Sequence, residues 1–399
     1  MLGISRYKVE LLFSAFWGIP VAIAIRLLKP LIHIRICRIY SERVGHFVMD
    51  SAEQIVKFSF KNPKEVRLFY FGDTSNQQWE KMVRRTIRIQ GNWIKGISDW
   101  NRILPFSKNF TLPSSSTGSR DLHGLLLKHD ARLSFTDSEN LEATSWLQSK
   151  GVKPDEKYIC LHVRDSTYLE VHNPQNINPE IMMHDDHRNA DIKSMLLAIE
   201  WLTNNDIWVI RMGKSVSNPL PTCLPRVIDY AFDPNRSDSL DIWLYANCLG
   251  SITTVSGIDS VGIVYRKPQL HFNMLPLGHL HAYLNCLTVP KNLFWRESGI
   301  ELTLAEYLDN DFTRAPEYME AGISIKDLTN EEILQAVIEF YERLMGVWMD
   351  SEESKSLQDR FWTKLADSKN FLDLQPWRHP ESRIGHAWLA SKEEKFFGD

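Results

Sequence analysis

A short stretch that ends in a histidine and an arginine is the part of this chain best suited to chemistry. The segment 157–166, KYICLHVRDS, begins as an apolar run typical of a buried β-strand and then delivers His162 and Arg164. Open α/β sheets bind ligands outside the carboxyl ends of their strands. Two cationic hydrogen-bond donors at such an end favour a nucleotide phosphate. The alternative is that Arg164 and Asp165 form only a surface ion pair that settles a loop.

A second motif about ninety residues on is expected at the same edge of the sheet. The segment 252–259, ITTVSGID, is a strand that ends in Ser256 and Gly257, with a helix starting directly after them. Glycine lets a phosphate approach the backbone, and the first amides of a helix attract an anion. The alternative is that Ser256 is an ordinary helix cap. Together with His162 and Arg164, the motif predicts a diphosphate cradle.

Two further loops are expected to leave the same edge. Arg211, Gly213 and Lys214 follow one strand candidate, while Ser237 and Asp238 precede a helix. Cationic strand ends suit phosphate and ribose recognition, and an Arg at the mouth of an apolar strand needs an anionic partner. We therefore assign all five residues to nucleotide binding, with helix capping as the alternative for Asp238.

The candidate acid–base residue lies near the N-terminus. Arg43, Gly45, His46 and Asp50 occupy a glycine turn and the first turns of a predicted helix. A histidine ionises near neutral pH, so His46 could deprotonate an acceptor hydroxyl. The alternative is a histidine that only caps or packs.

The sequence argues against a bound metal or cofactor. The cluster 184–187 (HDDH), with His172 nearby, lies in a polar loop, and consecutive ligands cannot all point at one ion. The acidic run 309–311 (DND) follows a helical pattern and has no strand before it. The chain also lacks a GxGxxG turn, a Walker-type loop and a GxSxG elbow. We expect no metal and no cofactor besides a nucleotide-sugar substrate.

Composition narrows the class of protein. The chain has 399 residues, of which 43% are hydrophobic, and a net charge of −4 in a mixed charge distribution. This length suggests two domains, and the charge gives no support to a nucleic-acid partner. The five cysteines are scattered singly, which suits a reducing cytoplasm.

The N-terminal region favours a membrane surface. Residues 11–25, LLFSAFWGIPVAIAI, are uncharged and are followed by Arg26 and Lys29. Fifteen residues fall short of the roughly 20 that a spanning helix needs, so a hairpin or an interfacial helix is expected, with Trp17 and Arg26 at headgroup level. The alternative is a core helix of a soluble protein.

Strand and helix patterns alternate along the chain and predict an α/β fold with parallel sheets. Residues 106–119 are expected to form a loop, and the domain boundary is placed between about Asp130 and Pro154. The predicted parts are a membrane-associating segment (1–30), an acceptor domain (31–150), a nucleotide-sugar domain (151–322) and a helical tail that packs back on the domains (323–399). Strands are expected at 32–40, 66–71, 158–163, 207–212, 227–230, 251–255 and 269–272, and helices at 46–57, 77–86, 190–203, 239–247, 259–265 and from 329 onward.

Over most of its length the chain resembles a family of bacterial glycosyltransferases associated with surface-polysaccharide loci. More distantly, His162-Val163-Arg164 looks like the His-x-Arg motif of fucosyltransferases that use GDP-fucose, although Asp165 stands where that motif has a second arginine. The resemblance implies a GT-B fold, which has two Rossmann-like parallel-sheet domains facing a cleft, binds the nucleotide sugar in the C-terminal domain and usually needs no metal. It rests on segments 43–46, 159–165, 187–192, 209–214, 237–238 with Asp241, 256–257 and 383–386.

These observations predict a metal-independent glycosyltransferase, cytoplasmic and peripherally attached to the inner membrane. It would move a sugar from a nucleotide sugar to a hydroxyl of a lipid-linked or cell-surface glycan precursor. Arg164 would neutralise the departing nucleoside diphosphate, His162 would help to position it, and His46 would serve the acceptor. The alternatives are a nucleotide-sugar epimerase or hydrolase of the same build, and a non-catalytic scaffold of polysaccharide export.

Overall fold

The fold was analysed in a computed structural model that describes residues 6–60, 62–165, 167, 186–221, 223–392 and 394–398. The chain divides into two compact units: unit 1 comprises Met1–Asp121 and Leu125–Phe135, and unit 2 comprises Leu122–Gly124 and Thr136–Asp399. The acceptor domain was predicted to end at residue 150, whereas unit 1 ends at Phe135, so helix α7 (Asp137–Ser149) belongs to unit 2. The functions assigned to the four predicted parts stay predictions.

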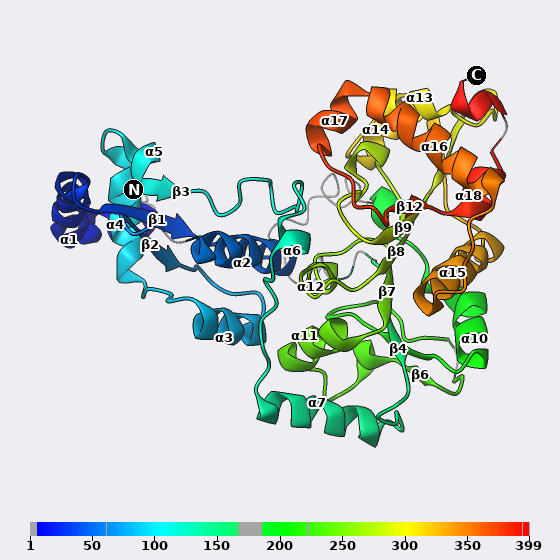
Figure 1. The fold of residues 1–399 in the computed structure, drawn as a ribbon, viewed down its shortest axis with the longest axis horizontal. Helices are drawn as coiled ribbons and strands as arrows, with labels where there is room; N and C mark the ends of the chain where they lie inside the picture. The colour runs from blue at the N-terminus through cyan, green and yellow to red at the C-terminus, as the bar shows by residue number, and fades with distance from the viewer. Residues whose placement is uncertain are drawn as a thin grey trace, which may run out of the picture. The chain divides into compact units, whose positions relative to one another are not determined.

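Unit 1 is built on a small parallel sheet with strand order β2-β1-β3 (Figure 1). β1, β2 and α2 lie within two residues of the predicted elements and α3 has the predicted bounds, whereas β3, α4, α5 and α6 were not predicted. Residues 106–119 are not wholly a loop, because Thr111 and Leu112 pair with β1 as a third strand. The elements are α1 (Arg6–Leu28), β1 (His33–Arg38), α2 (Val44–Ser59), β2 (Glu65–Tyr70), α3 (Gln77–Thr86), α4 (Trp93–Ile103), α5 (Ser107–Phe110), β3 (Thr111–Leu112) and α6 (Leu125–Lys128).

Residues 11–25 form part of one continuous helix, α1, so the predicted hairpin is wrong. The span Lys8–Leu28 is long and apolar enough to cross a membrane, with a mean hydropathy of 2.0. One face of α1 nevertheless belongs to the core of unit 1. Ala22 and Ile25 are buried in the same cluster as Ile36 of β1 and Tyr70 of β2.

Unit 2 contains a seven-stranded sheet whose neighbouring strands are all parallel. Its order, β12-β9-β8-β7-β4-β5-β6, is the 3-2-1-4-5-6 order of doubly wound Rossmann sheets, extended by β12. This confirms the predicted α/β class with a parallel sheet. The strands are β4 (Tyr158–His162), β5 (Trp208–Arg211), β6 (Val227–Ile228), β7 (Gly250–Thr253), β8 (Gln269–Met274), β9 (Cys286–Pro290) and β12 (Arg383–Ile384).

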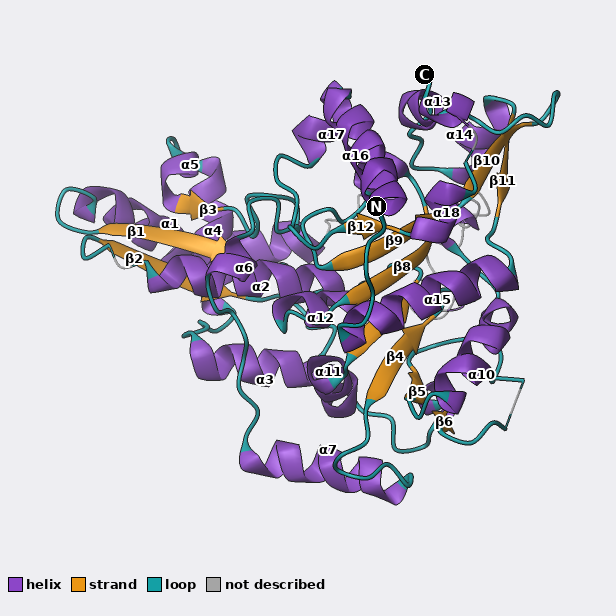
Figure 2. Ribbon diagram, turned by 45° about the vertical axis from the view of Figure 1, so that its right-hand side comes forward, coloured by secondary structure: helices purple, strands orange, loops and turns teal. Residues whose placement is uncertain are grey.

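Helices cover both faces of this sheet (Figure 2). On one side lie α10 (Leu196–Asn204) and α15 (Asn330–Met345), and on the other lie α11 (Asp238–Asn247) and α12 (Asp259–Val264). Such two-sided burial explains why every residue of β7 and β8 is buried. The remaining described helices and strands of unit 2 are α7 (Asp137–Ser149), β10 (Asn292–Trp295), α13 (Leu304–Asp309), α14 (Ala315–Glu320), β11 (Ile323–Lys326), α16 (Glu352–Asp367), α17 (Lys369–Leu374) and α18 (His386–Ala390).

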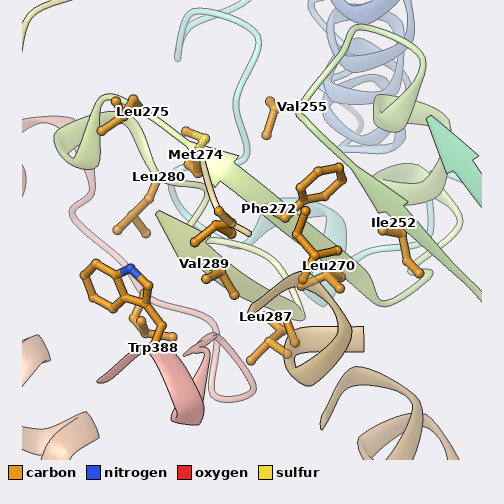
Figure 3. Packing of buried hydrophobic residues seen from close by; sticks show 14 of the residues in the cluster. Ile252, Val255, Leu270, Phe272, Met274, Leu275, Leu280, Leu287, Val289 and Trp388 are labelled. Carbon is orange, nitrogen blue, oxygen red and sulfur yellow. The ribbon is translucent and has the colours of Figure 1, made fainter. Parts of the chain in front are cut away.

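The C-terminal tail packs on unit 2. Thr329 caps α15 through the predicted capping box with Glu332. The tail is not purely helical, because β12 pairs with β9 and extends the sheet. Figure 3 shows Leu270 of β8, Val289 of β9 and Trp388 of α18 in one buried cluster, which also contains Val337 of α15.

Candidate functional site

The point where the strand order of the unit 2 sheet reverses lies between β4 and β7. These strands are paired in parallel, with His162 opposite Thr253. The backbone N–H of Arg164 donates to Thr254 Oγ1 at 2.9 Å, and the Thr254 N–H donates to the His162 carbonyl at 3.2 Å. The two sequence motifs therefore lie side by side, as predicted, at the switch point where open sheets bind ligands.

His162 differs from its predicted character. Burial lowers the pKa of His162 to about 4, with Arg211 and Arg164 adding to the effect and Asp165 opposing it. The imidazole is therefore neutral at pH 7, and of the two predicted cations only Arg164 carries charge. Within the described parts of the chain, the buried Nδ1 atom of His162 has no hydrogen-bond partner. A neutral ring suits orientation of a ligand better than charge neutralisation.

The turn after β7 is strained, and groups of the turn donate hydrogen bonds to the carboxylate of Asp259. Val255 has a φ of 63°, which is costly for a β-branched residue and is typical of functional turns. Asp259 accepts hydrogen bonds from the Ser256 N–H at 2.5 Å and from Thr253 Oγ1 at 2.8 Å, and Tyr245 also donates to it. The Ser256 amide predicted to cradle a phosphate is thus already used. Burial raises the pKa of Asp259, which is only 2% exposed, to about 6.

Asp259 therefore uses one of the donors of the predicted phosphate cradle, the Ser256 N–H, and the predicted contacts of Ser256 and Gly257 with a phosphate stay a prediction. The carboxylate of Asp259 closes the turn before α12, which is only six residues long. An Asp three residues after a Ser at a helix start is a capping pattern, which is the signal that could have revealed this arrangement.

Arg211 also has an internal partner. Its guanidinium is 2% exposed, and it donates to the Asn218 carbonyl at 2.6 Å and to Asp229 Oδ2 at 3.4 Å. The anion that we expected Arg211 to need is Asp229, which also accepts from the Leu220 N–H. Arg211 thus holds the loop after β5 in place, and its charge is not presented to a ligand.

The residues around the start of α11 are partly explained by capping. Ser237 caps α11 by accepting from the Leu240 N–H at 3.2 Å. Lys214 and Asp238 form a long ion pair of 3.8 Å and are both partly exposed. Gly213 leaves the space that the Val216 side chain uses, because a Cβ on Gly213 would lie 2.7 Å from Val216 Cγ1. Their predicted contacts with a nucleotide stay predictions.

Unit 1 brings together a histidine, a hydroxyl and a carboxylate at the switch point of its own sheet. His46 lies in the first turn of α2, after β1, and Ser119 lies in the loop after β3. His46 Nδ1 is 2.6 Å from Ser119 Oγ, which donates to Asp50 Oδ1 at 2.6 Å. Ser119 has a single proton and gives it to Asp50, so Nδ1 of His46 must be the donor. The lone pair of the imidazole is then on Nε2.

Carboxylates of α2 hold this loop. Asp50 is 2% exposed, its pKa is raised by burial, and Ser114 also donates to it. Glu53, one helical turn on, accepts from Ser115, Ser116 and Lys57. Burial raises the pKa of Glu53, but these hydrogen bonds outweigh it and lower the pKa. The hydroxyl groups of this loop were not predicted to bind Asp50 and Glu53, although the run SSSTGS at 114–119 after a short strand is a signal for them.

The residues weighed as metal ligands are only partly described. His172, His184 and Asp185 lie outside the described residues, and the buried ring of His187 packs 6.0 Å from that of Tyr318. Asp311 accepts a hydrogen bond from the Gly278 N–H at 2.8 Å, which gives it a structural role. In the described parts of the chain, no group of three His, Cys, Asp or Glu residues is placed to hold a metal.

The similarity of this chain to known proteins is found among solved structures. No family model and no curated protein matches this chain. Among solved structures it is similar to a glycosyl transferase family 9 protein from Veillonella parvula, with a TM-score of 0.45 and 10% identity over 79% of this chain and 98% of the other. It is also similar to ADP-heptose lipopolysaccharide heptosyltransferase II of E. coli, with a TM-score of 0.41 and 10% identity over 78% and 99% of the two chains. Likenesses below a TM-score of 0.5 do not say what this chain acts on, so the resemblance of its motifs to glycosyltransferase families stays a prediction.

Proposed function

We propose that this protein is a glycosyltransferase. It moves a sugar from a nucleotide sugar to a hydroxyl of a lipid-linked or cell-surface glycan precursor, and it needs no metal. The observation that supports the proposal is the pairing of β4 and β7 at the switch point of a 3-2-1-4-5-6 sheet. His162 ends β4 and Arg164 follows it, and open sheets bind nucleotides at this edge.

Unit 2 is proposed to bind the donor. The Arg164 guanidinium neutralises the negative charge that develops on the nucleoside diphosphate as the bond from the anomeric carbon to the phosphate oxygen breaks. The neutral ring of His162 orients the same group by hydrogen bonding. Lys214, at the neighbouring strand end, is the second cation within this proposal, since Arg211 is committed to Asp229.

Unit 1 is proposed to serve the acceptor. His46 Nε2 takes the proton of the acceptor hydroxyl as its oxygen forms the new bond to the anomeric carbon. The Nδ1–H donates to Ser119, and Ser119 donates to Asp50, so the buried carboxylate steadies the imidazolium that results. The proton ends on His46, and the electron pair of the broken bond leaves with the nucleoside diphosphate.

The test is a thermal-shift panel with UDP, GDP, ADP and CMP against the wild type and Arg164→Ala. One nucleotide should raise the melting temperature of the wild type and not of the variant, since binding to the native state stabilises it. Arg226→Ala is the matched control, because Arg226 precedes β6 at the opposite edge of the same sheet. If no nucleotide stabilises the wild type, the scaffold alternative replaces the transferase. Consumption of a nucleotide sugar at the same rate with and without acceptor identifies a hydrolase or an epimerase instead.

A further inference from the structure

Helix α1 has two unlike faces. Residues Leu12, Phe13, Phe16, Ile23 and Leu27 are spaced so that they share one face of the helix, which we call the docking face. They are large, apolar and exposed: Phe16 by 90%, Phe13 by 77% and Leu27 by 75%. The docking face runs over about 22 Å of helix at 1.5 Å per residue. An apolar stripe of this size on a protein surface marks an interaction site.

The opposite face of α1 is fastened to α4. Gly18 and Gly96 lie at the crossing of the two helices, and a Cβ on Gly18 would lie 2.9 Å from the Gly96 carbonyl oxygen. Trp17 Nε1 donates to the Trp93 carbonyl at 3.1 Å, and Arg26 donates to the Pro105 carbonyl at 3.0 Å. Trp17 and Arg26 thus spend hydrogen-bond donors on carbonyls of unit 1, and their predicted placement at headgroup level stays a prediction.

This fastening argues against a helix that crosses a bilayer, although its length would allow one. Ala22 and Ile25 are part of the core that also contains Ile97 of α4 and Phe110 of α5. Moving α1 into the bilayer centre would strip these contacts or draw α4 in with it. Lys95 and Asp99 of α4 form an ion pair, and charges of this kind are costly in hydrocarbon.

We propose that α1 lies in the plane of a membrane, with the docking face buried in the lipid of an anionic bilayer. Exposed cations lie at the end of α1 and on the helices of its core cluster, namely Lys29 directly after α1, Arg102 of α4, which is also 4.0 Å from Asp99, and Lys108 of α5. Two further exposed apolar side chains lie at these contacts: that of Trp93, whose carbonyl accepts from Trp17, and that of Phe106, next to the Pro105 carbonyl that accepts from Arg26. Apolar side chains with basic neighbours complement anionic headgroups over acyl chains. This inference does not depend on the proposed glycosyl transfer.

The first experiment is flotation of the full chain with vesicles of phosphatidylcholine, with and without phosphatidylglycerol. The double variant Phe13→Ser, Phe16→Ser should lose about a hundredfold in vesicle affinity, since two large apolar side chains no longer enter the lipid. The matched control is Leu141→Ser, Met349→Ser, which alters two equally exposed apolar residues of unit 2 and should float like the wild type. Unchanged flotation of the Phe13/Phe16 variant would overturn the proposal.

Two further measurements identify what covers the docking face and whether α1 lies on the bilayer or spans it. Lys29→Gln with Arg102→Gln should weaken binding by about tenfold, and only where phosphatidylglycerol is present. A cleavable tag fused before Met1 should stay open to added protease on sealed vesicles, whereas a protected tag would show that α1 spans the bilayer. A wild type that ignores vesicles but forms a dimer which the Phe13/Phe16 variant abolishes would show that a second copy covers the docking face, which also overturns the proposal.

Discussion

The two sheets of this protein carry different chemistry at equivalent places. In unit 2, the switch point between β4 and β7 presents Arg164 beside a neutral His162, and Asp259 fills the turn next to them. In unit 1, the switch point between β1 and β3 presents His46, backed by Ser119 and the buried Asp50. One place has an arginine beside a neutral histidine, and the other has a histidine joined through a hydroxyl to a buried carboxylate.

The comparison shows that a shared topology decides where chemistry occurs and the side chains decide which chemistry it is. A cation at a strand end binds a charged group without moving a proton. A histidine whose Nδ1–H is held leaves Nε2 as the atom that accepts a proton. Binding and turnover, measured independently in the variants, separate these two tasks.

His46→Gln is expected to have the largest effect. Loss of the base should lower the transfer rate by about a hundredfold to ten-thousandfold, because general-base catalysis contributes roughly that much. Nucleoside diphosphate affinity should stay within twofold of the wild type. Steady-state transfer and a binding titration check the two halves, and a variant that retains full turnover would remove His46 from the reaction.

Arg164→Lys tests the cation more finely than deletion does. Lysine keeps the charge but loses the planar fork that grips a diphosphate, so nucleotide affinity and turnover should both fall by about tenfold. The measurement is calorimetric titration with the nucleotide that stabilises the wild type. Affinity equal to that of the wild type would mean that Arg164 acts only as a point charge.

Ser119→Ala should lower turnover by about tenfold, because His46 Nδ1 loses the acceptor that fixes its tautomer. Ser116→Ala is the control. Ser116 lies in the same loop, but it donates to Glu53 of α2 and does not contact the relay of His46, Ser119 and Asp50. The two variants should lose similar stability in urea unfolding. Equal loss of turnover in both would mean that the loop, and not the relay, matters.

The lowered pKa of His162 predicts a pH-dependent stability. The unfolded chain protonates this residue near pH 6.5, whereas the folded chain does so near pH 4, so its contribution is present above pH 6.5 and is lost as the pH falls to 4. Asp259, whose pKa is raised to about 6, changes stability in the opposite sense. The free energy of unfolding of the wild type minus that of His162→Gln, measured in urea across this range, should fall by about 2 to 3 kcal/mol. A difference that does not change with pH would contradict a buried, neutral His162.

Ser237→Ala should have the smallest effect. Loss of the cap on α11 costs about 1 kcal/mol of stability. If capping is the only role of Ser237, nucleotide affinity will not change. A drop in affinity larger than the drop in stability would return Ser237 to the predicted nucleotide site.

Local pattern predicted most strands of the two sheets but not β3, β9 and β12. It did predict the meeting of the β4 and β7 motifs, because alternating elements imply a parallel sheet with a shared edge. Partners far apart in the chain were not predictable in this way. Ser119 lies 69 residues from Asp50 and 73 from His46, so only the fold joins them. The charge state of His162 depends on burial, and the internal partner of Arg211 depends on a strand pairing that local pattern does not define.

The division of tasks between the two switch points is tested most directly by one set of titrations. The nucleotide that stabilises the wild type is titrated calorimetrically into wild type, Arg164→Ala and His46→Gln. We predict that Arg164→Ala loses about a hundredfold in affinity while His46→Gln binds like the wild type and fails only in transfer. Equal affinity in all three proteins, or equal loss in both variants, would contradict the account.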